Sequence, residues 1–204
     1  MIESEIKASL EGIDREDLIA RIGRLGFRAE ESKHQTDVYY NGRDRDFRKT
    51  DEALRLRRTE YAGGSEKSAI TYKGPKMDSV TMTREEIQTD VRDGQEADRL
   101  IRALGFEPVM TVEKTRQRYT NYELLADPKL DRTWTPVTKH AMAVCIDDVS
   151  GLGPFIEIEI LLKDDSGLGA ARANLHQMLD VLMVPQENAT TKSYLDQLME
   201  KNEE

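Results

Sequence analysis

The sequence lacks the cysteines that build disulfide scaffolds or thiolate metal centres. It also lacks the long apolar runs that form membrane spans. Among its 204 residues only Cys145 is a cysteine, so the chain can form neither an internal disulfide nor a thiolate metal cluster. The N-terminus has no basic segment followed by an apolar one, and no apolar run approaches the roughly 20 residues of a membrane span. These features predict a soluble, cytoplasmic protein without a membrane partner.

An excess of positive charge is also missing. The chain has 30 Lys and Arg against 39 Asp and Glu, which gives a net charge of −9. Proteins that bind nucleic acid in general need a positive field to attract phosphates, so we expect no nucleic-acid partner. Hydrophobic residues make up 38% of the chain and charged residues 34%. This composition is typical of a folded, polar globular protein that can bury a substantial core.

The first predicted strand, residues 2–7, has an unusual pattern of charge. Glu3, Glu5 and Lys7 alternate and so share one face, while Ile2 and Ile6 share the other. The simplest interpretation of this segment alone is an exposed edge strand with a charged face. The same alternation returns near the other end of the chain, in residues 157–159, and charged residues alternate in several strands between them.

Hydrophobic periodicity predicts helices over residues 14–25, 95–104, 169–184 and 193–200. The apolar face of the second is expected to hold Ala97, Leu100, Ile101 and Leu104. Alternation and β-branched residues predict strands within residues 2–7, 27–40, 53–58, 69–73, 83–91, 112–119, 141–149 and 155–160. Residues 126–140 have neither period, so we expect a long surface loop there that could serve as a lid.

The helix over residues 14–25 and the helix over residues 95–104 end in similar sequences, because Leu-Gly-Phe occurs at both positions 25–27 and 104–106. Each is followed by a strand that leads toward charged residues. The chain is therefore interpreted as one domain of residues 1–204, with two related halves at about 1–92 and 93–204.

Charges recur on the polar face of nearly every predicted strand. The basic members are Lys7, Arg55, Arg57, Lys73, Arg84, Lys114 and Arg116, and the acidic members are Glu3, Glu5, Glu86, Asp147, Glu157 and Glu159. In an open sheet these side chains would simply be solvated. In a closed sheet they would line a barrel too wide to be filled by its own side chains. Carboxylates there suit Mg²⁺ or Mn²⁺, and the Arg and Lys suit a polyanion such as a triphosphate.

These motifs resemble the CYTH superfamily, the triphosphate tunnel metalloenzymes. The resemblance begins with Glu3-x-Glu5-x-Lys7 and spans almost the whole chain. It continues through residues 53–57 (Ala-Leu-Arg-Leu-Arg), 71–75 (Thr-Tyr-Lys-Gly-Pro), 84–86 (Arg-Glu-Glu), 114–116 (Lys-x-Arg), 146–159 and 192–194 (Lys-Ser-Tyr). It implies an α+β fold, an eight-stranded antiparallel β-barrel that forms a tunnel, with helices packed outside.

The resemblance also implies roles for individual residues. Divalent metal, Mg²⁺ or Mn²⁺, would be bound or supported by Glu3, Glu5, Asp147, Glu157 and Glu159. Phosphate oxygens would be bound by Lys7, Arg55, Arg57, Lys73, Lys114, Arg116 and Lys192, while Arg84 with Glu86 would line the tunnel beside the substrate. The expected catalytic residues are Glu5, Lys7, Lys114 and Asp147. Where many members have a second Glu after Arg-Glu-Glu, this chain has Gln88, and an amide is a weaker metal ligand than a carboxylate.

Two reactions are compatible with such a site, and the resemblance is stronger to the class IV adenylyl cyclase branch. A cyclase of this kind converts ATP to cyclic AMP and pyrophosphate and implies a homodimer. The first alternative is a hydrolase of inorganic triphosphate or thiamine triphosphate. The second is a module that binds a nucleotide or polyphosphate without converting it. Both reactions stabilise charge that develops on phosphoryl oxygens.

Overall fold

The computed structural model of the chain describes residues 2–77, 81–129 and 140–203. Its strands are β1 Ile2–Ser9, β2 Arg28–Ala29, β3 Lys33–Gly42, β4 Ala53–Tyr61, β5 Glu66–Lys73, β6 Arg84–Val91, β7 Phe106–Thr120, β8 Met142–Val149, β9 Gly153–Leu162 and β10 Ala189–Thr190. Its α-helices are α1 Arg15–Arg24, α2 Phe47–Thr50, α3 Gly94–Ala103, α4 Tyr122–Leu125, α5 Leu168–Leu182 and α6 Tyr194–Glu203. Most of the loop predicted over residues 126–140 lies outside the described residues.

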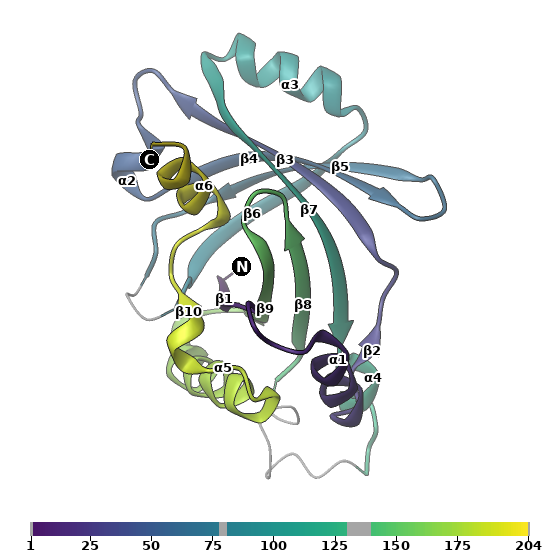
Figure 1. The fold of residues 1–204 in the computed structure, drawn as a ribbon. Coiled ribbons are helices and arrows are strands. Elements are labelled where there is room, and N and C mark those ends of the chain that lie inside the picture. The colour runs from purple at the N-terminus through teal and green to yellow at the C-terminus, as the bar shows by residue number, and fades with distance from the viewer. Residues whose placement is uncertain (1, 78–80, 130–139, 204) are drawn as a thin grey trace.

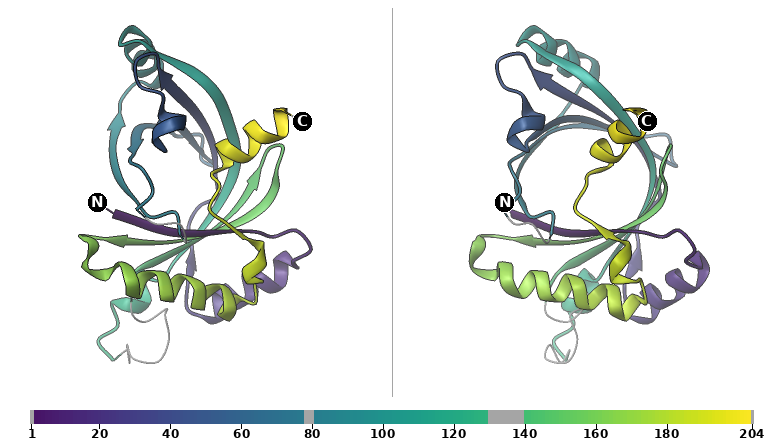
Figure 2. Two further views of the ribbon diagram at one scale, coloured as in Figure 1. Left: turned by 90° about the vertical axis from the view of Figure 1, so that its left-hand side faces the viewer. Right: turned by 60° about the vertical axis from the view of Figure 1, so that its left-hand side comes forward.

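Eight antiparallel strands close into a barrel, as the right panel of Figure 2 shows. Their order is β1-β6-β5-β4-β3-β7-β8-β9, and β9 pairs back onto β1 from Ile2↔Leu162 to Ser9↔Phe155. The closed barrel with outside helices is therefore confirmed, and the open sheet is wrong. The β1–β6 pairing is short, with two residue pairs at Ile2↔Glu85 and Glu3↔Arg84.

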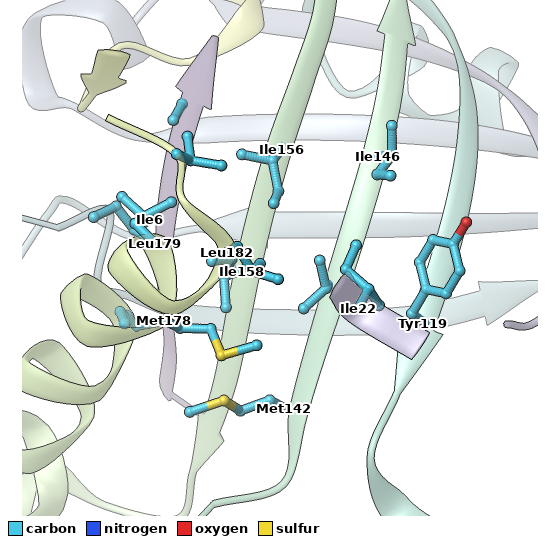
Figure 3. Close-up of a cluster of buried hydrophobic side chains, with 14 of the residues drawn as sticks. Ile6, Ile22, Tyr119, Met142, Ile146, Ile156, Ile158, Met178, Leu179 and Leu182 are labelled. Atoms are coloured by element: carbon cyan, nitrogen blue, oxygen red, sulfur yellow. The ribbon is translucent and has the colours of Figure 1, made fainter. Parts of the chain in front are cut away.

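The main hydrophobic core lies outside the barrel, between β1, β8 and β9 and the helices α1 and α5 (Figures 1 and 3). Ile158 on β9 is fully buried there, as are Met178 and Leu179 on α5. Because neighbouring residues of a strand point to opposite faces, this outward packing turns Glu157 and Glu159 into the barrel. The charged face is thus the interior, which explains the unusual alternation at both ends of the chain.

The helix α3 covers the opposite side of the barrel, over β3, β4 and β5 (Figure 1). A smaller core forms there from Tyr40, Leu56, Ala97 and Ile101. The expectation that Leu100 and Leu104 join it is wrong, because they are 59% and 68% exposed. Only a narrow face of α3 contacts the curved sheet, so its other apolar residues stay exposed to solvent.

The helix boundaries follow their capping residues. The side chain of Asp14 accepts a hydrogen bond from the Asp17 N–H (3.0 Å) and begins α1, while Gly26, at φ +86°, follows its end. A positive φ favours glycine, which has no Cβ. The helix α2 was not predicted; the side chain of Asp46 accepts a hydrogen bond from the Arg48 N–H and caps it. Among the described helices, none is long and apolar enough to span a membrane.

Candidate active site

The interior of the barrel encloses a cavity of about 530 Å³. Inward side chains of β1, β3–β7 and β9 line it, together with residues of α2 and α6. Figure 2 shows these two helices beside the opening of the barrel. The predicted site residues that line this cavity are Glu3, Glu5, Lys7, Arg55, Arg57, Lys73, Arg84, Glu86, Lys114, Arg116, Glu157 and Glu159. One cavity inside the closed barrel therefore brings together side chains that are up to 156 positions apart in the sequence, from Glu3 to Glu159.

Three carboxylates gather where β1 pairs with β9. Glu5 lies opposite Glu159 in the strand register, and oxygens of Glu5, Glu157 and Glu159 all lie within 4.8 Å of one another. Burial and the charge of Glu157 raise the pKa of Glu5 to about 7, and burial raises the pKa of Glu159. Burial also opposes ionisation of Glu157, yet Arg116 and Lys7 hold the pKa of that carboxyl well below its usual range.

This donor set fits a hard divalent cation. Carboxylate oxygens are the ligands that Mg²⁺ and Mn²⁺ prefer, and three of them crowd together with little access to solvent. Burial and the neighbouring charge of Glu157 both disfavour ionisation of Glu5 and raise its pKa, and a bound cation would favour its ionised form. Glu5, Glu157 and Glu159 are thus the residues that could hold the metal.

The raised pKa of Glu5 predicts an unusual pH dependence of stability in metal-free protein. Its pKa of about 7 in the fold exceeds the ordinary value of 4.5, so the folded chain binds more protons than the unfolded chain between these values. The free energy of unfolding should therefore fall as pH rises through this window. The raised pKa values of Glu3 and Glu159 act in the same direction.

Urea denaturation in EDTA at pH 5 and pH 8 measures this effect. We expect a lower midpoint at pH 8, recovery when Mg²⁺ is added at pH 8, and a weaker pH dependence in Glu5→Gln. A metal-free midpoint that rises between pH 5 and pH 8 would contradict the crowded carboxylates.

Asp147 lies at the centre of a buried ionic cluster. Its carboxylate accepts two hydrogen bonds from Arg116 (2.7 and 2.6 Å), one from Lys114 Nζ (3.0 Å) and one from the Tyr194 hydroxyl (3.1 Å). Burial opposes its ionisation, but Arg116 and Lys114 lower the pKa of Asp147. Asp147 therefore sits among cations and outside the carboxylate trio, although the resemblance implied a role beside the metal. Its position is that of an anchor for two phosphate-binding candidates.

Arg116 and Lys7 connect this cluster to the trio. The Arg116 guanidinium pairs with Glu157 and, at 3.0 Å, with Glu159. The Lys7 ammonium lies 3.1 Å from Glu157 and 4.1 Å from the centre of the Tyr194 ring. A triphosphate that entered the cavity would compete with these carboxylates for the same cations.

The opposite wall carries a second cationic group. In the circular strand order β3 and β4 lie across from β1 and β9, and Arg55 and Arg57 of β4 face inward. The carboxylate of Asp37 on β3 is buried between them, 2.6 Å from Arg57 and 3.6 Å from Arg55. Burial opposes ionisation of Asp37, but the two guanidinium groups lower its pKa strongly. This wall has the geometry of an anion-binding surface.

The remaining predicted residues either lie at the cavity or point away from it. Lys73 of β5 pairs with Glu86 and, at 3.3 Å, with Glu3, so Glu3 lies beside the trio without belonging to it. The guanidinium of Arg84 donates to the carbonyls of Asp51 (3.0 Å) and Gly74 (3.2 Å) at the cavity wall. The structure does not bring Lys192 into the cavity, because its exposed ammonium contacts Glu200 at 2.7 Å.

Asp37, Arg118 and Tyr194 were given no role by the sequence analysis. Arg118 and Tyr194 line the cavity, and Asp37 pairs with Arg55 and Arg57. Arg118 alternates with Lys114 and Arg116 on β7, and Asp37 alternates with Gln35 and Tyr39 on β3. Strand alternation was thus a signal for both. No such signal existed for Tyr194, which begins α6 and reaches the cavity through its contacts with Lys7 and Asp147.

The chain belongs to the CYTH domain family, whose model matches residues 1–194. This confirms the resemblance that was inferred from the alternating charged residues. Enzymes of this family act on triphosphate substrates and depend on a divalent metal, which agrees with the cations and the carboxylate trio in the cavity.

Known relatives resemble the chain over nearly its full length. A protein of Methanocaldococcus jannaschii named "Putative adenylate cyclase MJ0240" is 34% identical over 196 residues, 96% of this chain and 98% of its own. The PH1819 protein of Pyrococcus horikoshii OT3 has a TM-score of 0.78 and 32% identity, covering 98% of this chain and 99% of its own. The Hippeastrum protein HpAC1, described as having a dominant triphosphatase activity, has a TM-score of 0.61 and 15% identity, over 98% of this chain and 95% of its own.

Proposed function

We propose that this protein is a class IV adenylyl cyclase-like enzyme that converts ATP to cyclic AMP and pyrophosphate with Mg²⁺ or Mn²⁺. One observation carries the proposal: a single cavity inside the barrel holds a carboxylate trio on one wall and buried Arg and Lys side chains beside and across from it. A triphosphate with its metal satisfies both sets of charges, whereas either ligand alone would leave one set uncompensated.

The residues of the cavity have distinct parts in this proposal. Glu5, Glu157 and Glu159 hold the metal, which neutralises charge on phosphoryl oxygens. Lys7 and Arg116 exchange their contacts with Glu157 and Glu159 for phosphate oxygens, Lys114 binds the triphosphate from its place beside Asp147, and Arg55 binds it from the opposite wall. Asp147 fixes Lys114 and Arg116 in position. Charge that develops on the leaving pyrophosphate is then stabilised by cations placed before the reaction begins.

The rim of the cavity favours a nucleotide over a bare triphosphate. Phe47 of α2, Val109 of β7, and Leu195 and Met199 of α6 add apolar surface to the cavity lining, beside the polar Arg48 and Asp196 of the same helices. A cavity with an ionic interior and some apolar lining on these helices suits a ligand that has phosphates at one end and a nucleoside at the other. The name of the Methanocaldococcus jannaschii relative agrees with this choice. The homodimer expected from the resemblance stays a prediction.

Hydrolysis of inorganic triphosphate or thiamine triphosphate is the second candidate. The groups that would hold a triphosphate and its metal lie in the interior and need no contact with a base or a ribose. The same cations and carboxylates therefore suit attack of water on the terminal phosphorus.

Product analysis with ATP, inorganic triphosphate and thiamine triphosphate, each with Mg²⁺ or Mn²⁺, distinguishes these reactions. We expect cyclic AMP and pyrophosphate from ATP. Orthophosphate from inorganic triphosphate, without cyclic AMP from ATP, would replace the cyclase by the hydrolase. Binding of these compounds without any product would favour the non-catalytic module.

A further inference from the structure

Two neighbouring arginines of the cavity, Arg55 and Arg57, make very different contacts. Nε and Nη2 of Arg57 each donate to an oxygen of Asp37 at 2.6 Å. This paired geometry occupies one edge of the Arg57 guanidinium. Arg55 meets the same carboxylate only at 3.6 Å, through Nη1. Asp37 therefore engages Arg57 much more fully than it engages Arg55.

Arg55 is held instead by a relay of uncharged groups. Its Nη2 donates to the hydroxyl of Thr71 on β5 (3.2 Å), and that hydroxyl donates to the side-chain oxygen of Gln88 on β6 (3.1 Å). Thr71 is fully buried. The relay fixes the Arg55 guanidinium without adding a negative charge to this wall.

The relay leaves one donor of Arg55 without a partner among the described residues. Among the described residues, Nε of Arg55 has no hydrogen-bond partner, although this atom is buried and its side chain lines the cavity. A buried N–H without a partner is unfavourable, and an acceptor that enters the cavity would satisfy it. A phosphate oxygen is the acceptor that the surrounding positive charge favours.

We propose that Thr71 and Gln88 are positioning residues that keep Arg55 available for phosphate, and that position 88 requires a neutral side chain for this purpose. The proposal rests on the proposed binding of a triphosphate in the cavity. A carboxylate at position 88 has the same shape as the amide, but it would attract the Arg55 guanidinium and repel the phosphates. The amide that departs from the family pattern thus serves anion binding on this wall.

Isothermal titration with inorganic triphosphate in EDTA tests the proposal, because it measures anion binding without metal or turnover. We expect Gln88→Glu to weaken binding by about tenfold or more, equivalent to about 1.4 kcal/mol for each factor of ten. Gln88 is exposed to solvent on β6, so the substitution should leave the fold intact. The matched control is Thr89→Glu, which places the same charge at the next, exposed position on the outer face and should change the affinity less than about twofold by the usual size of surface effects.

The pH dependence separates positioning from structural damage. The affinity ratio of wild type to Gln88→Glu should shrink as pH falls toward the ordinary Glu pKa of about 4.3, because protonation restores a neutral side chain. Thr71→Val, which removes the hydroxyl and keeps the shape, should weaken binding several-fold without this pH response.

The possible outcomes distinguish a failure of the relay from a failure of the proposed function. A Gln88→Glu variant that binds triphosphate as tightly as wild type, or whose deficit does not change with pH, would overturn the relay. A wild-type protein that binds triphosphate neither in EDTA nor with Mg²⁺ would overturn the proposed function, whereas one that binds it only with Mg²⁺ would overturn the relay alone.

Discussion

Glu5→Gln is expected to lower kcat by about a thousandfold, equivalent to a loss of about 4 kcal/mol in transition-state stabilisation. The amide keeps the shape of the side chain but removes one of three carboxylates that lie within 4.8 Å of one another. An amide binds a divalent cation more weakly, so less charge on the phosphoryl oxygens is neutralised. Release of pyrophosphate from ATP measures the rate.

The same variant should fold at least as well as wild type when metal is absent. Ionisation of Glu5 is unfavourable in the fold, since burial and Glu157 raise its pKa to about 7, and the amide has no charge to bury. Thermal unfolding in EDTA checks this point. Glu85→Gln, at an exposed position on β6, is the control and should keep wild-type kcat. Wild-type kcat in Glu5→Gln would exclude Glu5 from metal binding.

Asp147→Asn is expected to lower the free energy of unfolding by about 3–5 kcal/mol, the usual cost of removing one partner from a buried ionic group. The carboxylate of Asp147 is fully buried and pairs with both Lys114 and Arg116. Its loss leaves positive charge in the barrel wall without its main counter-charge. Urea denaturation at pH 7 gives the change in free energy.

The adjacent residue offers a matched control for this substitution. Asp148 points outward on the same strand, is 47% exposed and pairs with Arg15 at the surface. Exposed pairs contribute about 1 kcal/mol or less, so Asp148→Asn should be nearly neutral. A loss of less than about 1 kcal/mol in Asp147→Asn, by the same measure, would mean that Asp147 does not anchor the two cations.

Local sequence patterns predicted which side chains line the barrel, because the face on which a strand residue lies depends only on its position along that strand. Alternation placed Glu3, Glu5 and Lys7 on one face, and the outward packing of Ile6 against the main core shows why that face is the interior. Closure itself is not local. It depends on the eight residue pairs between β1 and β9, strands at opposite ends of the chain, and the resemblance to a family supplied what periodicity left open.

The sequence pattern could not predict how each helix docks on the barrel. The period of α3 identified its apolar residues correctly, but not that the curved sheet buries Ala97 and Ile101 and leaves Leu100 and Leu104 exposed. The motif at residues 192–194 marked the correct region, yet Tyr194 rather than Lys192 enters the cavity. Which residue of a helix turns inward depends on how the helix docks, and the motif alone does not determine this.

The most direct test of a metal–triphosphate cavity is a crystal structure with Mn²⁺ and an ATP analogue that cannot react. The anomalous signal of Mn²⁺ should lie among Glu5, Glu157 and Glu159, with the triphosphate inside the barrel and a phosphate oxygen at Nε of Arg55. Mn²⁺ bound away from these carboxylates, or a triphosphate bound outside the barrel, would contradict the account.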